Sequence, residues 1–569
     1  MGSLLDTLSA RIEAATGTDS ELRPSTKPQF GHFQCNVALR LAAEQGRKPR
    51  EVAQKIVDKL DLDDLCEPLE IAGPGFINIR VRASVLAEAV IEQLADPYCG
   101  ITQTTQPDTV VVDYSSPNVA KQMHVGHLRS TIIGDCFTRV LRACGHTVIP
   151  QNHIGDWGRQ FGMLIEQIID EGLDLDALDL AGAEELYLRA NAHLNADPAF
   201  ADRARARVVA LQAGDEDTRA VWRKLIEISE AGFSATYARL QVLLTDDDIA
   251  GESIYNDMLP EICADLEARG IAVIDDGALV VFVPGIDAPA ILRNSTGGYG
   301  YDVTDLAAIK HRLARFGATR LVYVTDARQH DHFMKFFAVA RMAGYLPETV
   351  TAEHIGFGMV LGPDGTPFKT REGTAVHLDD LLDEAEAVAT QKARENTAAR
   401  LDDLLDEAET LSVPEVALAT IKYADLSSQL QKDYVFDVNR MTATTGDTGP
   451  YLQYAHARVS RILRRAEADG GLPQQARITA LADPAEQALA LLLTRFSSVV
   501  AEVAAELTPH KLCGYLFELA SSCSSFYEQC PVLKSEGEVR ASRLVLCQAT
   551  KRVLATGLGL LGIHAPEVM

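Results

Sequence analysis

The chain has 569 residues, of which 47% are hydrophobic, and its formal net charge at pH 7 is -27. Its mean hydropathy of -0.01 is that of an ordinary globular protein, and its length allows several domains with separate cores. The acidic balance argues against nonspecific nucleic-acid binding, whereas a specific site depends on the local charge distribution.

The amino terminus and the cysteines favour a cytoplasmic protein. Met1–Asp6 lacks the basic and apolar regions of a secretory signal. No apolar run approaches the ~18 residues of a membrane span, so no membrane partner is expected. The ten cysteines are scattered without paired spacing, as in reduced proteins.

Residues 1–108 predict a small α+β module. An amphipathic helix opens it, a second helix lies around Val52 to Leu60, and residues 70–81 form an extended segment interrupted by Gly73-Pro74-Gly75. The Thr- and Gln-rich stretch 101–108 is typical of a linker.

A β-α-β unit follows. Val110–Val112 predicts a buried strand, and Gly145 is a helix stop before a second strand that begins at Thr147. Between them, apolar residues recur every four positions, as on one face of a helix: Leu128, Ile132, Cys136, Val140 and Cys144.

Strands and helices alternate through the rest of an expected second domain, residues 109–377. A helical insertion is predicted at about 164–245, and strands return at 278–283, 320–324 and 355–361. This alternation predicts a Rossmann-like α/β domain, with a parallel sheet and ligand sites at its carboxyl edge.

From about Leu378 the pattern is helical to the end. We divide it into a helical connector, 378–445, and a C-terminal helical bundle, 446–569. The bundle is neutral, with 12 Lys and Arg against 12 Asp and Glu, so the acidity lies elsewhere, much of it within 170–248.

The strongest chemical signal lies in residues 115–127, where the first helix of the β-α-β unit begins. Unpaired N–H groups at a helix start bind anions, and Gly126 lets a flat ligand such as adenine approach the backbone. His124 and His127, one turn apart, can donate hydrogen bonds to a phosphate in its transition state. The pattern therefore indicates chemistry on a nucleotide.

Two alternatives exist for these histidines. They could be ordinary helix-start residues, or zinc ligands completed by His153, His330 or His332. No HExxH or CxxC pattern accompanies them, so neither structural zinc nor another metal site is expected.

A second loop, residues 362–373, is rich in Gly and Pro and presents Lys369 and Arg371. A basic loop facing a helix start can close on the β- and γ-phosphates of a nucleotide. Taken alone, the loop is equally typical of a solvated hairpin turn.

Together the two loops resemble the HIGH and KMSK motifs of class I aminoacyl-tRNA synthetases. Residues 115–130, SSPNVAKQMHVGHLRS, are similar to arginyl-tRNA synthetases specifically, and so are residues 152–161, 299–306, 326–333 and 368–373. The matches occur in order from about residue 110 to the C-terminus. The chain is identified as a member of that family, of bacterial type.

The resemblance implies the residues that handle ATP. Thr370 takes the place of the last lysine of KMSK, and Lys121, three residues before His124, would substitute for it at the α-phosphate. Lys369 and Arg371 would hold the leaving pyrophosphate. The implied catalytic residues are Lys121, His124, His127, Lys369 and Arg371, and the implied ATP-binding residues are His124, Gly126, His127, His332, Gly358, Met359 and Val360.

The resemblance also implies an arginine pocket made of Asp113, Asn118, Glu252, Tyr301, Asp305 and Gln329. Asp113 and Asp305 are the expected partners of the guanidinium, and Asp305 follows Tyr301 by one helical turn. Asn118 and Gln329 would hold the α-amino and carboxylate groups. A helix cap at Asp305 and simple packing at Tyr301 are the alternatives.

Two regions are expected to contact tRNA. Arg458, Arg461 and Arg465 form a stripe at i, i+3 and i+7, preceded by Tyr451 and Tyr454, which suits phosphate contacts and base stacking. A solvated basic face is about as common. The resemblance implies that the C-terminal bundle binds the anticodon stem and loop, and that the N-terminal module contacts the D-arm elbow through Phe33, Gln34 and Asn36.

The expected function is arginine–tRNA ligation: L-arginine and ATP, with Mg²⁺, give arginyl-adenylate, and arginine then passes to the 3′ end of tRNA(Arg). We expect a cytoplasmic monomer that binds no DNA. The alternative is a non-catalytic tRNA-binding paralogue, against which the intact Lys121, His124, His127 and Asp305 argue.

Overall fold

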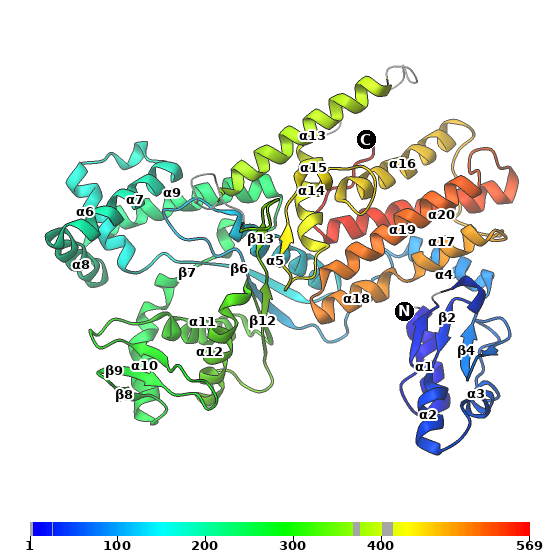
Figure 1. Cartoon of the computed structure of the whole chain (residues 1–569), viewed down its shortest axis with the longest axis horizontal. Coiled ribbons are helices and arrows are strands. Elements are labelled where there is room, and N and C mark those ends of the chain that lie inside the picture. Colours follow the sequence, from blue (N-terminus) through cyan, green and yellow to red (C-terminus); the bar gives the residue numbers. More distant parts are fainter. Residues whose placement is uncertain (1–3, 26, 368–375, 401–412) are drawn as a thin grey trace. The chain divides into compact units, whose positions relative to one another are not determined.

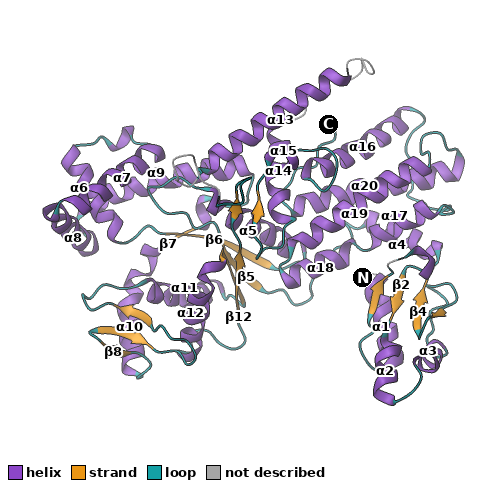
Figure 2. Cartoon of the chain, in the orientation of Figure 1, coloured by secondary structure: helices purple, strands orange, loops and turns teal. Residues whose placement is uncertain are grey.

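The structure is a computed structural model that describes residues 4–25, 27–367, 376–400 and 413–569. It divides into two compact units (Figures 1 and 2). One comprises Met1–Thr104, Asn396–Ala419 and Ala443–Met569, and the other, here called the catalytic unit, comprises Thr105–Glu395 and Thr420–Thr442.

The N-terminal module is α+β, as predicted. A four-stranded antiparallel sheet has the order β1-β2-β4-β3, with β1 at Leu22–Pro24, β2 at Phe33–Cys35, β3 at Glu70–Ala72 and β4 at Phe76–Ile79. The expected break at residues 73–75 is the turn between β3 and β4. The helices are α1 (Leu4–Thr16), α2 (Val37–Gln45), α3 (Pro49–Val57) and α4 (Ala83–Ala95).

The same unit contains the C-terminal helices α16 (Gly449–Ala468), α17 (Pro484–Thr494), α18 (Phe496–Glu506), α19 (Pro509–Gln529) and α20 (Gly537–Leu560). Helix α4 packs against α17 and α20. Arg552 of α20 donates to the carbonyl oxygens of Leu94 and Asp96 at the end of α4.

The expectation that no apolar run approaches the length of a membrane span is wrong in this bundle. Pro484–Glu506 is long and apolar enough for a membrane span, with a mean hydropathy of 1.6 in its 18-residue window. The run is nevertheless divided at Arg495 into α17 and α18, and 56% of the window is buried inside the protein. Its apolar character therefore serves the core of the bundle.

The catalytic unit is built on a five-stranded sheet whose order is β12-β11-β5-β6-β7 and whose pairs are all parallel. The strands are β5 (Thr109–Asp113), β6 (Thr147–Ile154), β7 (Ile249–Gly251), β11 (Arg320–Asp326) and β12 (Thr351–Phe357). Helix α5 (Val125–Ala143) connects β5 to β6, and all five apolar residues predicted for its buried face are at most 6% exposed.

The strand order reverses beside β5. The chain adds β6 and β7 on one side of β5 and later adds β11 and β12 on the other side. In such a sheet the ligand crevice lies where the order reverses, outside the carboxyl ends of the strands. The predicted α/β fold class is confirmed, and the reversal lies between β5 and β11.

Two predicted strands lie elsewhere than expected. Residues 278–283 contain β9 (Ala278–Val281), which belongs to a separate antiparallel sheet with β8 (Val273–Asp275) and β10 (Ala290–Arg293), because the tight turn at Asp276-Gly277 pairs β9 with its neighbour in sequence. Residues 355–361 are split between β12 and β13 (Val360–Leu361). The latter pairs with β14 (Tyr434–Val435), inside a region predicted to be wholly helical.

The remaining elements of the catalytic unit are helical. The insertion between β6 and β7 consists of α6 (Arg159–Glu171), η2 (Leu175–Ala177), α7 (Leu180–Ala196), α8 (Pro198–Ala213), α9 (Glu216–Leu240) and η3 (Asp246–Asp248). After β7 come η4 (Glu252–Met258), α10 (Leu259–Ala268), α11 (Tyr301–Phe316), η5 (Ala327–Gln329) and α12 (His330–Met342). The connector holds α13 (Leu378–Arg400), α14 (Val413–Leu426) and α15 (Val438–Met441), and its residues 396–419 belong to the first unit.

Candidate active site

Most of the predicted active-site residues directly follow the carboxyl end of a parallel strand. Asn118 and Lys121 to His127 follow β5, Glu252 follows β7, Gln329 and His332 follow β11, and Gly358 to Val360 follow β12. Since parallel strands end at one edge of their sheet, the fold brings these residues to the same edge. Tyr301 and Asp305 come from the first turns of α11.

His124 and His127 hold each other at the start of α5. His124 is the N-cap, and its Nδ1 accepts the backbone N–H of Gly126 at 3.0 Å. The backbone N–H of His124 donates to Nδ1 of His127 at 3.1 Å, and the two ring centroids lie 3.9 Å apart. With Nδ1 accepting in each ring, the neutral imidazoles carry their protons on Nε2.

Both imidazoles are neutral at physiological pH. Burial, followed by the charges of His124 and Lys121, lowers the pKa of His127 to about 3. Burial also lowers the pKa of His124, against the opposing charge of Glu184. The helix start therefore presents two neutral Nε2–H donors, which can donate hydrogen bonds to phosphate oxygens.

Gly126 is required by the protein itself as well as by a ligand. A Cβ at this position would lie 2.7 Å from Cε1 of His124, so a larger residue would displace the imidazole. The same glycine thus keeps the backbone open and the capping ring in place.

The loop between β5 and α5 is strained and held by the insertion. Its non-glycine residues with positive φ are Ser115 (74°), Ser116 (51°) and Ala120 (60°). Tyr237 Oη lies 2.7 Å from Ser115 Oγ, and Ser229 Oγ accepts the N–H of Ala120 at 3.0 Å. The sequence gives no sign of these two α9 contacts, because nothing in a helical pattern shows which loop a hydroxyl will contact.

His332 lies among acidic residues of α11. Its Nε2 is 2.7 Å from Asp305 Oδ2, and its Nδ1 is 3.4 Å from Asp302 Oδ1. Burial lowers the pKa of His332, but hydrogen bonds and charges from the two aspartates outweigh it and raise the pKa to about 9. The ring is therefore an imidazolium, and it lies beside Asp305, one of the residues predicted to bind the substrate arginine.

Glu252 is a second acidic group near Asp305. Burial, and then the negative charge of Asp305, raise its pKa to about 7. Its place is fixed by Asp156, which accepts the N–H and the Oγ–H of Ser253 at 2.8 and 2.5 Å. A Cβ on Gly251 would collide with Asp156 at 2.1 Å. Asp156 lies within a stretch that resembles the family, 152–161, but had been given no role.

Asp113 stays a prediction as a partner of the substrate guanidinium, and in the structure its carboxylate is paired with Arg312. The residue is 4% exposed, and its carboxylate is 2.5 Å from the guanidinium of Arg312, which is completely buried. Ser116 donates to the other carboxylate oxygen at 3.2 Å. A buried carboxylate needs such a partner, and the sequence did not reveal that Arg312 of α11 would face it.

The other residues predicted to bind the substrate arginine are exposed at the same edge. Tyr301 is 68% exposed, with its ring edge-on to His332 at a centroid distance of 5.1 Å. Asn118 and Gln329 are exposed as well. Their side chains are accessible to a ligand.

The segment expected to contact adenine, Gly358 to Val360, is fastened by Arg129. This buried α5 residue donates to the carbonyl oxygen of Gly358 at 2.7 Å and pairs with Asp425 at 3.2 Å. Asp433 accepts the N–H of Met359 at 2.6 Å. An arginine on a helix with so many apolar residues was a signal that sequence analysis left unused, because a buried guanidinium is seldom without partners.

Lys369, Thr370 and Arg371 lie outside the described residues. The chain that follows them returns to the start of α5: Val125 N–H donates to the carbonyl of Val376 at 3.0 Å, and Leu378 N–H donates to the carbonyl of Met123 at 2.8 Å. His377 forms a bridge with His124. Residues 376–378 are thereby joined to the first motif.

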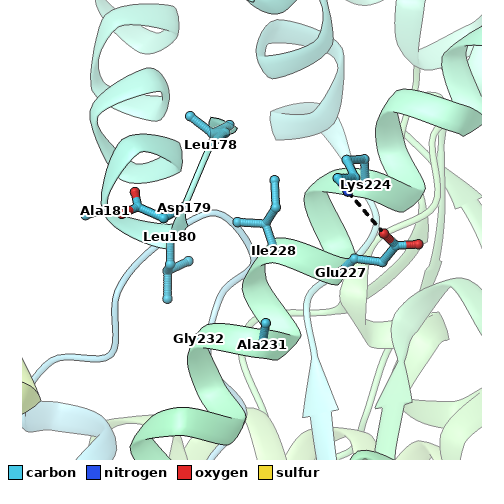
Figure 3. A pocket seen from close by; sticks show the side chains of 9 residues that line it. All are labelled: Leu178, Asp179, Leu180, Ala181, Lys224, Glu227, Ile228, Ala231 and Gly232. Atoms are coloured by element: carbon cyan, nitrogen blue, oxygen red, sulfur yellow. Dashed lines mark ion pairs between the residues drawn. The ribbon is translucent and has the colours of Figure 1, made fainter. Parts of the chain in front are cut away.

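Within the described ranges, no three His, Cys, Asp or Glu side chains are grouped as a metal site. A pocket of about 520 Å³ lies in the insertion. Figure 3 shows its lining, with Leu178 to Ala181 on one side and residues of α9, including Ile228, on the other. None of the predicted site residues lines it.

Comparison with known proteins identifies the family. Its family models match in chain order: "Arginyl tRNA synthetase N terminal domain" over residues 3–81, "tRNA synthetases class I (R), catalytic domain" over 90–438, and "DALR anticodon binding domain" over 452–569. The chain belongs to the arginyl-tRNA synthetase family. The expected family and its ligase activity, that of a class I aminoacyl-tRNA synthetase, are thereby confirmed.

Full-length relatives support the same conclusion. The arginine–tRNA ligase of Cutibacterium acnes is 62% identical, with 100% of both chains covered, and that of Edwardsiella ictaluri is 47% identical over 98% of this chain and 97% of its own. The solved arginyl-tRNA synthetase of Thermus thermophilus is 28% identical, with a TM-score of 0.82 and 100% of both chains covered.

In the synthetase's N-terminal module, Phe33 stays a prediction as a tRNA contact. Its ring is 1% exposed and forms part of the core under β2. Gln34 is half-buried and donates to Asn78 Oδ1 at 3.0 Å, and Asn36 is half-buried before α2. Both of these remain predictions.

The predicted basic stripe of the synthetase lies on α16. Arg461 and Arg465 are exposed, whereas Arg458 is half-buried with its guanidinium 4.4 Å from the ring centre of Tyr527. Tyr451 is half-buried beside Phe517, at a centroid distance of 5.7 Å, and Tyr454 is half-buried too. The two exposed arginines are therefore the most accessible cations of the stripe.

Proposed function

We propose that this arginine–tRNA ligase performs both half-reactions at the carboxyl edge of the parallel sheet. A carboxylate oxygen of arginine attacks the α-phosphorus of ATP, and the bond to pyrophosphate breaks. A hydroxyl of the tRNA 3′ adenosine then attacks the acyl carbon, gives up its proton, and AMP leaves. The observation that carries this proposal is one edge with both neutral imidazole donors and an acidic pocket.

The phosphate side of the site uses the start of α5. His124 and His127 donate through Nε2 to phosphate oxygens, and Gly126 leaves room for the nucleotide. Lys121 supplies the ammonium that stabilises charge at the α-phosphate, with Lys369 and Arg371 on the pyrophosphate. No covalent enzyme intermediate is needed, so rate enhancement comes from positioning and charge stabilisation.

The amino acid side uses the acidic residues beyond β7 and on α11. Asp305 and Glu252 bind the guanidinium, Tyr301 borders it, and Asn118 and Gln329 take the α-amino and carboxylate groups. We assign His332 to orienting Asp305, in place of an ATP contact, because its ring is bonded to that carboxylate. Asp113 acts indirectly, by holding Arg312.

Mg²⁺ would enter with ATP as part of the substrate and would draw charge from its phosphates. The tRNA partner is tRNA(Arg), contacted through Arg461 and Arg465 and through Gln34 and Asn36. We further propose a monomer that works in the cytoplasm, where translation takes place.

Two substitutions separate the two sides of the site. Lys121→Ala lowers kcat of ATP–pyrophosphate exchange by about 100-fold or more with little change in arginine KM, since it removes a transition-state contact. Asp305→Asn raises arginine KM by about 10- to 100-fold, since it removes a charged hydrogen bond. An unchanged kcat in the first variant, or an unchanged arginine KM in the second, rejects that assignment.

A further inference from the structure

A side chain of the insertion contacts Lys121, the proposed catalytic lysine. Lys121 Nζ lies 4.0 Å from the ring centre of Tyr187, on α7. Both side chains are half-buried. An ammonium at this distance over an aromatic face is attracted to it, and partial burial strengthens the attraction. Lys121 therefore has a defined place before substrate arrives.

The same helix also contacts the residues on either side of the histidine pair. Gln122 Nε2 donates to Glu184 Oε2 at 3.0 Å, and His377 Nε2 is 3.9 Å from the same oxygen. Glu184 lies one turn before Tyr187, so one face of α7 presents both. The carboxylate thus connects the end of the 115–122 loop to the segment that bridges His124.

We propose that α7 is a working part of the active site, with Tyr187 and Glu184 as positioning residues for adenylate formation. Tyr187 holds the Lys121 ammonium near the α-phosphate site. Glu184 keeps Gln122 and His377 in register around His124. This inference rests on the proposed role of Lys121. It gives the insertion a role in catalysis, which is to position active-site side chains.

Tyr187→Leu tests the first contact. The variant removes the aromatic face but keeps an apolar side chain, and it should lower kcat of ATP–pyrophosphate exchange by about 5- to 30-fold with arginine KM unchanged. Tyr187→Phe retains the ring face and should keep kcat within about twofold of wild type. The neighbouring exposed Leu188, changed to Ala, is the matched control on α7 and should leave kcat unchanged.

A double substitution distinguishes positioning from a structural effect. If Tyr187 acts through Lys121, then Tyr187→Leu lowers kcat no further in a Lys121→Met background, because the effects of substitutions at contacting residues are not additive. Full additivity, or a melting temperature lowered in Tyr187→Leu alone among these variants, overturns the inference. So does a kcat that rises in Tyr187→Leu, since the contact would then restrain the lysine.

These variants distinguish a failure of the proposed Lys121 role from a failure of the proposed α7 role. If Lys121→Met itself leaves kcat intact, the proposed role of Lys121 fails and the inference falls with it. If Lys121→Met lowers kcat and Tyr187→Leu does not, only the role of α7 is rejected. Glu184→Gln keeps an acceptor for Gln122 and should retain most of kcat, whereas Glu184→Leu should lower it. Equal kcat in the two Glu184 variants contradicts the second contact.

Discussion

At the scale of single residues, the carboxyl groups of the acidic pocket differ in how far neighbouring cations neutralise them. Asp113 is paired with Arg312 and Asp305 with His332, while Glu252 is half-buried near the charge of Asp305. Burial and like charge both favour the protonated form of Glu252. A bound guanidinium reverses this preference, so arginine binding and ionisation of Glu252 are coupled.

This coupling predicts a pH dependence. The pKa of Glu252 is raised to about 7, so the group is neutral below that pH and a carboxylate above it. Arginine stays cationic throughout, so its KM should fall by roughly tenfold from pH 6 to pH 8. Pyrophosphate exchange at varied arginine measures this. Glu252→Gln should have a higher KM and a flat profile, and an unaltered slope in that variant contradicts the assignment.

The residue scale also marks the limit of sequence interpretation. The motif gave the identity and spacing of His124, Gly126 and His127, because helix capping is a local property. Arg312, Tyr237 and Tyr187 were missed because each acts across a long sequence separation. The burial of Phe33 was missed for the same reason: an aromatic in a polar stretch looks accessible until its strand is paired.

At the scale of elements, α5 is held close to β5 by a glycine. A Cβ on Gly134 would lie 2.2 Å from Cγ of Tyr114, the residue that follows β5. Tyr114 is fully buried and cannot move aside cheaply. Since α5 carries both histidines at its start, its distance from the sheet sets their position. The apolar spacing predicted this helix, but the close approach of Gly134 to Tyr114 depends on tertiary packing.

Gly134→Ala should therefore destabilise the catalytic unit by about 1–3 kcal/mol, although alanine favours helix by about 1 kcal/mol. Gly514→Ala in α19 is the matched control, because a Cβ there meets nothing within 4 Å. It should be neutral or slightly stabilising. Urea denaturation followed by circular dichroism compares the two. A Gly134→Ala protein as stable as wild type would show that the helix can shift without cost.

At the scale of the whole molecule, charge is distributed unevenly. The chain carries -27 overall, while residues 446–569 have 12 Lys and Arg against 12 Asp and Glu. A neutral bundle with an exposed basic stripe on α16 can approach an anionic partner that the rest of the chain repels. The sequence showed this stripe by its spacing, and the structure leaves Arg461 and Arg465 exposed.

Replacing Arg461 and Arg465 together by Ala should raise tRNA KM and reduce the slope of log KM against log salt by about 1 to 2, because fewer phosphate contacts release fewer counterions. Arginine and ATP KM should not change. Arg477→Ala provides a control for lost charge elsewhere in the bundle. Aminoacylation at several salt concentrations gives the slopes. If the double variant and the control share one slope, the stripe is a solvated helix face.

The most direct test of the central claim is ATP–pyrophosphate exchange with each of the twenty amino acids, with and without total tRNA. The enzyme should exchange with arginine and with no other amino acid, because only a guanidinium matches the pocket of Glu252 and Asp305. Exchange with a different amino acid would contradict the pocket. Absence of exchange under all conditions would contradict catalysis itself and leave a tRNA-binding paralogue.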